Sequence, residues 1–242
     1  MSGSIVDDEA TPPIPPTEAG PSNQTKPRRG LPPLTLLGIG LLVAGLTCLG
    51  WVGYQYFGTN VVSERAFDTE SEQLRTKWGE ESQSDPDGKK QASVIPGEAI
   101  GLLRIPAFGN DYEIPILNGT DLSVLSKGVG HYESTAAPGQ IGNFAIAGHR
   151  VTHGQPFAQL LDLKRGDEVI VETRDAIYTY ALDDSPRQLT VKDSDTWVID
   201  PVPGQPDVKP TQPLITLTTC QDLFRSADRS IGFGHLVSTQ NK

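Results

Sequence analysis

Residues 213–230, "PLITLTTCQDLFRSADRS", contain the pattern that decides the fold. Branched residues alternate up to Cys220, which is the pattern of a β-strand that packs on one face. After the cysteine the chain becomes polar and charged, so the strand is predicted to end there. The thiol would therefore lie at a strand terminus, where loops meet the scaffold and reactive groups are commonly displayed.

Similar runs recur from Val94 to the C-terminus. Seven further strand-like segments, separated by Gly, Pro, Asp and Asn, read AIGLLRIP, YEIPIL, GNFAIAG, DEVIVET, AIYTYAL, RQLTV and SIGFGHLV. The helical candidates between them, LSVLSKG and PFAQLLDL, are short, whereas a parallel α/β fold needs a substantial helix between most strands. The sequence predicts a mainly β domain over residues 94–242, a barrel or sandwich of eight strands with short helices.

Residues 34–58, "LTLLGIGLLVAGLTCLGWVGYQYFG", carry no charged side chain. A helix of this length, rising about 1.5 Å per residue, spans a hydrocarbon core of about 30 Å. The run is too long for the apolar part of a signal peptide, and its aromatic residues suit a membrane interface. We expect an uncleaved transmembrane helix within residues 31–58.

The segments around this helix predict its orientation and the organisation of the chain. Residues 1–30 contain basic residues just before the helix, so the positive-inside bias places the N-terminus in the cytoplasm and the domain outside the cell. Rich in Pro, Ser, Thr and Gly, this segment is a predicted disordered tail. Residues 59–93 are a predicted extracellular stalk and linker. One helical face of the stalk either packs on the domain or continues the stalk, and it carries Phe67, Leu74 and Trp78.

The composition excludes some classes of function. A formal net charge of −10, without a cluster of Lys and Arg, argues against nucleic acid as a partner. The two cysteines, Cys48 in the apolar segment and Cys220, exclude a disulfide framework and a Cys-x-x-Cys metal site. No acidic cluster predicts a calcium site, and we predict neither a metal nor a cofactor.

Cys220 is either an inert buried thiol or a nucleophile. In an extracellular domain an unpaired thiol is exposed to oxidation, so its presence calls for a use or for deep burial. Arg225 and Arg229 follow it, and a nearby guanidinium favours the reactive thiolate. These observations favour the nucleophile.

A thiolate that cleaves an amide needs a group that protonates the leaving amine. His149 follows the strand-like run GNFAIAG, so it lies at a strand-to-loop junction as Cys220 does, and it is the candidate for this role. The remaining histidines are predicted to be loop, surface or packing residues; they are His131, His153 and His235.

The motifs "GVGHYESTAAPGQIGNFAIAGHR", "PFAQLLDLKRGDEVIVET" and "TLTTC", followed by an arginine, resemble the sortases, specifically the class E housekeeping type. The resemblance spans nearly all of residues 99–237. It implies an eight-stranded sortase-type β-barrel on the outer face of the cytoplasmic membrane. It also implies a cysteine transpeptidase that cleaves secreted proteins between Thr and Gly of a C-terminal LAxTG or LPxTG-like sorting signal. The protein would then be joined to an amine of a lipid-linked peptidoglycan precursor.

The resemblance also implies roles for individual residues. Cys220 matches the nucleophile, His149 the general acid, and Arg229, favoured over Arg225, the oxyanion and substrate-positioning group. Arg229 is favoured because it directly precedes the strand expected to return beside Cys220.

Substrate contacts are expected ahead of His149 and just before the cysteine. Tyr132 matches a tyrosine that the class E type associates with Ala after the leading Leu of the signal, although it could simply pack the loop. Thr218 and Thr219 would line the pocket or serve as structural β-branched residues. The chain departs from the family pattern in lacking a Pro shortly after the cysteine and in having two glycines in SIGFGHLV.

Two other functions remain open at this level. A pilin-polymerising sortase shares the same core, but it typically has a second, C-terminal membrane helix and an aromatic lid that this sequence lacks. A catalytically silent extracellular binding module could also retain the barrel.

Overall fold

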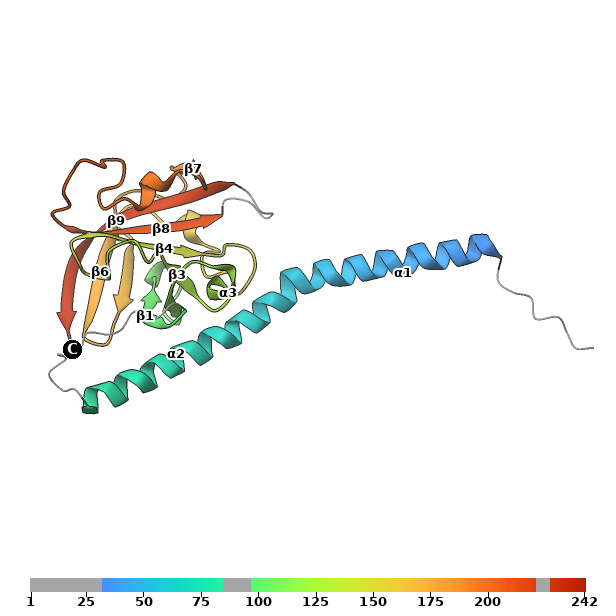
Figure 1. The fold of residues 1–242 in the computed structure, drawn as a ribbon, viewed down its shortest axis with the longest axis horizontal. Coiled ribbons are helices and arrows are strands. Elements are labelled where there is room, and N and C mark those ends of the chain that lie inside the picture. Colours follow the sequence, from blue (N-terminus) through green and yellow to red (C-terminus); the bar gives the residue numbers. More distant parts are fainter. Residues whose placement is uncertain (1–31, 85–96, 221–226) are drawn as a thin grey trace, which may run out of the picture. The chain divides into compact units, whose positions relative to one another are not determined.

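The computed structural model describes residues 32–84, 97–220 and 227–242 (Figure 1). The predicted cytoplasmic tail, residues 85–93 of the predicted linker and Arg225 lie outside these ranges, as does the side chain of Cys220. The chain divides into two units, residues 1–46 and residues 47–242.

The N-terminal helical segment begins with α1 (Pro33–Gly53), continues through a π-helical turn, η1 (Tyr54–Gly58), and leads into α2 (Thr59–Ser84). None of the side chains of α1 is buried, and the helix is long and apolar enough to cross a membrane. The predicted transmembrane segment therefore has the expected helical form.

The second unit contains a closed β-barrel. Its eight strands are hydrogen-bonded in the order β6-β5-β1-β2-β3-β4-β8-β9, and β6 pairs with β9 to close the ring. The β2–β3 and β4–β8 pairs are parallel, and the other pairs are antiparallel. The barrel strands are β1 (Ala99–Arg104), β2 (Ile114–Asn118), β3 (Val129–His131), β4 (Gly142–Gly148), β5 (Glu168–Glu172), β6 (Ala176–Leu182), β8 (Pro213–Cys220) and β9 (Asp228–Asn241).

The smaller elements lie in the connections. The ninth strand, β7 (Thr190–Lys192), pairs with the first residues of β9 and is not part of the closed ring (Figure 1). The short helices are η2 (Pro106–Phe108), α3 (Leu122–Leu125), η3 (Leu160–Asp162) and η4 (Thr196–Ile199). The candidate PFAQLLDL thus forms a single 3-10 turn between otherwise irregular residues.

The predicted eight-stranded barrel is confirmed, but one of its strands was assigned wrongly. Seven of the eight predicted runs form barrel strands, whereas RQLTV forms β7. The remaining barrel strand is β3, which is too short to show a period of two. His131 ends β3 and is only 6% exposed, so its prediction as a loop or surface residue was wrong.

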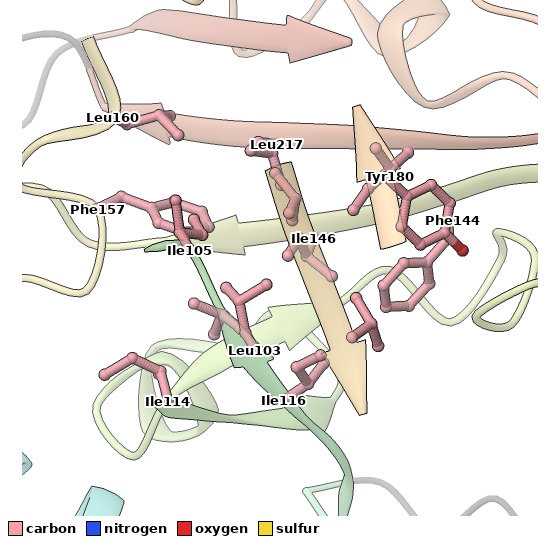
Figure 2. Close-up of a cluster of buried hydrophobic side chains, with 14 of the residues drawn as sticks. Leu103, Ile105, Ile114, Ile116, Phe144, Ile146, Phe157, Leu160, Tyr180 and Leu217 are labelled. Atoms are coloured by element: carbon pink, nitrogen blue, oxygen red, sulfur yellow. The ribbon is translucent and has the colours of Figure 1, made fainter. Parts of the chain in front are cut away.

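The barrel interior is filled by apolar side chains from nearly every strand. Figure 2 shows several of them pointing into a common interior, among them Leu103 of β1, Ile146 of β4 and Tyr180 of β6. In β8, Ile215 and Leu217 belong to the same cluster. Each such side chain contributes about 1.5–3 kcal/mol by leaving water. The alternation seen in the sequence of β8 is therefore the alternation of a strand with one face in the core.

The stalk helix α2 packs on the barrel. Phe67 and Leu74 are 5% and 4% exposed, and Phe67 belongs to the main core cluster. Trp78 lies beneath the ammonium group of the C-terminal Lys242, 4.6 Å from ring centroid to Nζ. Of the two alternatives for this helical face, the structure shows packing on the domain.

Candidate active site

The end of the β4–β8 ladder brings two of the predicted catalytic residues to neighbouring positions. The last pair in this parallel register is Gly148 and Thr219, and the Thr219 hydroxyl donates a hydrogen bond to the Gly148 carbonyl at 2.8 Å. His149 directly follows Gly148 of β4, and Cys220 directly follows Thr219 on β8. They therefore emerge side by side at the same edge of the sheet.

Arg229 lies on the other side of Cys220. The two residues are register partners in the antiparallel β8–β9 pair, which places their Cα atoms about 4.5–5.5 Å apart. Arg229 is the second residue of β9, as expected from its place before the returning strand. The backbone thus gathers His149, Cys220 and Arg229 on three adjacent strand ends.

The environment of His149 keeps its imidazole neutral. Burial, and secondarily the positive charge that His153 can carry, lower the pKa of His149 to about 4. The two rings stack with their centroids 4.7 Å apart. The Nε2 atom of His149 is buried and has no hydrogen-bond partner within the described ranges. No hydrogen bond among the described residues therefore occupies this nitrogen.

The guanidinium of Arg229 is held by groups near the start of β9. Its Nη1 donates to the carbonyl of Asp228 at 3.1 Å, and its Nη2 lies 3.7 Å from Oδ2 of Asp193, which follows β7. Because the Asp193 carboxylate is more than half exposed, this ion pair is worth about 0–1 kcal/mol.

Two of the predicted substrate-binding residues meet at this edge. Tyr132 follows β3, and its hydroxyl oxygen lies 3.4 Å from Oγ1 of Thr218 on β8. Thr219, by contrast, uses its hydroxyl to bridge β8 to the Gly148 carbonyl of β4. The structure thus gives Thr219 a structural contact and places Tyr132 over Thr218.

A buried network that was not predicted holds the segment with Tyr132. Nδ1 of His131 lies 3.2 Å from Oδ1 of Asn118, and its Nε2 lies 3.1 Å from both the Ala136 carbonyl and Oγ1 of Thr135. Thr135 in turn donates to the Tyr132 carbonyl at 2.7 Å. Burial lowers the pKa of His131, while the Ala136 carbonyl opposes this shift. The sequence signalled His131 only by its place directly before Tyr132.

No group of three or more His, Cys, Asp or Glu side chains among the described residues is arranged to hold a metal ion.

Comparison with known proteins identifies the family. Residues 103–237 match the family model of the sortase domain. The chain is 36% identical to Sortase SrtE1 of Streptomyces coelicolor over 204 residues, which cover 81% of this chain and 55% of SrtE1. It is 31% identical to Sortase SrtE2 of the same organism over 218 residues, which cover 86% of this chain and 83% of SrtE2. The chain thus spans about half the length of SrtE1 and most of SrtE2.

Solved structures agree with this. The structure of sortase E from Streptomyces avermitilis matches with 40% sequence identity and a TM-score of 0.55, covering 61% of this chain and 93% of that protein. The family match extends over more than half of the chain and includes the ends of β4, β8 and β9, where the candidate catalytic residues lie. The chain therefore belongs to the sortase family of transpeptidases, and sortases of the E type are among its relatives.

Proposed function

We propose that this protein is a membrane-anchored cysteine transpeptidase. It cleaves a C-terminal LAxTG or LPxTG-like sorting signal of secreted proteins between Thr and Gly, and it transfers the protein to an amine of a lipid-linked peptidoglycan precursor. The observation that carries the proposal is the backbone arrangement of three strand ends, with Cys220 between His149 and Arg229.

In the first half of the reaction the sulfur of Cys220 attacks the carbonyl carbon of the signal threonine. His149, neutral because its pKa is lowered to about 4, accepts the thiol proton as the S–C bond forms. The resulting imidazolium donates this proton to the glycine nitrogen, and the C–N bond breaks. The glycine leaves with a neutral amine, and a thioester to Cys220 remains.

In the second half an amine of the precursor attacks the thioester carbon. His149 accepts a proton from the attacking nitrogen, the C–S bond breaks, and the departing sulfur recovers a proton from the imidazolium. The enzyme returns to its starting protonation state. Because the proton passes twice through one imidazole, no further acid or base is needed.

Arg229 stabilises the negative charge that develops on the carbonyl oxygen in both halves. The guanidinium carries a permanent positive charge and several N–H donors in a planar fork. Its place opposite Cys220 and its weak ion pair with the exposed Asp193 support this role.

Tyr132 contributes to recognition of the signal. Its hydroxyl lies near Thr218, two residues before Cys220, so the phenol ring stands beside the strand that leads to the nucleophile. The class E resemblance associates a tyrosine in this position with a preference for Ala after the leading Leu. We therefore propose LAxTG as the better signal.

A membrane anchor would keep the catalytic domain close to both of its proposed substrates. The apolar α1 would span the cytoplasmic membrane with the N-terminus inside the cell, leaving the barrel outside. Secreted proteins that bear the signal and the lipid-linked precursor are both accessible on that face.

The proposal is tested by incubating the full chain, in lipid nanodiscs, with LAxTG and LPxTG peptides and a small amine acceptor. Mass spectrometry should show the peptide joined through its threonine to the acceptor, with faster turnover of LAxTG, and no product with Cys220→Ala. In a parallel reaction that offers a pilin subunit beside the small amine, transfer only onto a lysine of the pilin would indicate the polymerising type. Absence of any product would support a silent module.

A further inference from the structure

The connection after β4, residues 149–157, carries the proposed general acid and is here termed the His149 loop. Three consecutive residues in it have positive φ: His153 at 56°, Gly154 at 76° and Gln155 at 50°. Residues other than glycine rarely adopt this conformation, and it persists only where the surroundings hold it. The Gln155 N–H donates to the Thr152 carbonyl at 3.2 Å and closes this turn within the loop, and contacts from outside the loop act together with this bond to hold its shape.

The middle of the loop is held by α2. Oδ1 of Asn60, in the first turn of α2, accepts a hydrogen bond from the Gly154 N–H at 2.9 Å. About two turns further on, the ring of Phe67 packs against the same glycine. A Cβ on Gly154 would lie only 2.5 Å from this ring. The contact with α2 thus includes a polar bond and a close packing contact at a single residue.

The barrel holds the far end of the loop. The Tyr112 hydroxyl donates to the Pro156 carbonyl at 2.7 Å, and the fully buried Phe157 ring packs in the main core cluster. Within the loop, the Phe157 N–H donates to the His149 carbonyl at 2.9 Å. Residues 153–155, which have the positive φ values, lie between these points. Asn60 is therefore placed to hold the residues between the end of β4 and Pro156.

One of the residues with positive φ, His153, contacts the His149 ring directly. The His153 ring, next to Gly154, stacks on the His149 ring at an interplanar angle of 24°. Since Nε2 of His149 lacks a hydrogen-bond partner among the residues that the structure describes, that nitrogen is not oriented by a bond of its own. A shift of Gly154 would move His153 and, with it, one wall against which the His149 imidazole rests.

The helix itself is fixed along its length. Ion pairs join Glu70 to Lys127 at 3.0 Å and Arg75 to Glu113 at 2.7 Å, and Lys77 contacts Glu98. Together with the packed residues Phe67 and Leu74, these pairs give α2 several attachments to the barrel besides the loop contact.

We propose that α2 is a positioning element of the active site, and that Asn60 holds the His149 loop so that the His149 ring meets the reacting atoms. The inference rests on the proposed role of His149. On this proposal α2, which follows the membrane segment, supports catalysis. If α2 were only a tether, changes to its side chains would leave turnover unchanged.

The test compares three variants of the full chain in nanodiscs, using peptide transfer as the assay. Asn60→Ala removes the acceptor of the Gly154 N–H, whereas Asn60→Asp keeps an oxygen at that place. Thr69→Ala is the matched control, since Thr69 is exposed on the same helix and donates only to the Arg65 carbonyl one turn before it. The readouts are kcat, KM, the melting temperature and the NMR signals of the His149 and His153 rings.

We expect Asn60→Ala to lower kcat roughly tenfold or more, since a misplacement of about 1 Å can cost about 100-fold, with KM nearly unchanged. Its two histidine ring signals should shift. Asn60→Asp should recover most of kcat, and Thr69→Ala should match wild type in every readout.

A His149→Ala variant tests the proposed role of His149 separately from the proposed role of α2. If His149→Ala retained turnover, the proposed role of His149 would fail, and the inference with it. If His149→Ala were inactive while Asn60→Ala kept wild-type kcat and ring signals, α2 would be only an anchor and the inference alone would be wrong. A loss of kcat that follows the melting temperature with unshifted ring signals would likewise overturn it.

Discussion

Replacement of Gly148 by alanine should damage both the barrel and the active site, because Gly148 is the residue directly before His149. A Cβ at this position would lie 2.7 Å from one ring carbon of Phe157 and 3.0 Å from two others. Phe157 is fully buried in the main core, so its ring cannot swing away into solvent. Either the ring or the end of β4 must move.

The structure sets the size of both effects. Overpacking of this kind costs about 1–3 kcal/mol. For a chain of this size that corresponds to a fall in melting temperature of about 2–12 °C. Phe157 is also hydrogen-bonded through its N–H to the His149 carbonyl, so a shift of either residue moves the imidazole. A displacement of about 1 Å should lower kcat/KM roughly 100-fold.

Near-UV circular dichroism during heating measures the melting temperature. Peptide transfer is measured at about 25 °C, where the variant stays folded. Gly79→Ala is the control, because a Cβ on this glycine of α2 meets nothing within 4 Å. Alanine in a helix interior is favoured over glycine by about 1 kcal/mol, so the control should be as stable as wild type or more so, and equally active. A Gly148→Ala variant with wild-type melting temperature and kcat/KM would show that the contact with Phe157 constrains neither the barrel nor His149.

Three further predictions follow from the site. Arg229→Lys should lower kcat roughly 100-fold or more, as expected for loss of an oxyanion donor, while Arg225→Lys stays near wild type in the same transfer assay; the reverse ranking would exchange their roles. Tyr132→Ala should weaken the preference for LAxTG over LPxTG peptides by about 1–3 kcal/mol, measured as the ratio of kcat/KM values; an unchanged ratio would leave Tyr132 a packing residue. In the folded state the pKa of His149 is about 4, below the usual value of about 6.5. Between these two pH values the unfolded chain binds more protons than the folded chain, so the free energy of unfolding should fall as pH drops through this window. Urea unfolding of wild type and His149→Gln between pH of about 4 and 7 checks this, and identical pH dependence in both would contradict it.

The sequence was sufficient for most of the fold because its strands are long enough to show a period. In β8, Ile215 and Leu217 enter the core and alternate with threonines on the other face of the strand. This alternation can be recognised from the sequence alone. β3 has three residues and no period, and β7 shows the composition of a strand although it pairs outside the ring. Membership of a barrel depends on long-range pairing that a local pattern does not contain.

The same distinction separates the predicted and unpredicted parts of the site. Residues at the ends of strands, such as His149, could be proposed from local pattern and family resemblance. The support around them could not, because Asn60 lies 94 positions before Gly154 in sequence, and nothing local connects an amide in a stalk with a glycine in a distant loop. The network of His131 and Asn118 was missed for the same reason.

Cys220 should form a thioester with the sorting signal during the reaction. The thioester is tested most directly by mixing the full chain with an LAxTG peptide in the absence of an amine acceptor, quenching in acid and mapping the digested protein by mass spectrometry. The fragment containing Cys220 should gain the mass of the peptide up to its threonine, hydroxylamine should remove this mass, and Cys220→Ala should show no adduct. An adduct that persists in Cys220→Ala, or peptide cleavage by that variant at the wild-type rate, would contradict this prediction.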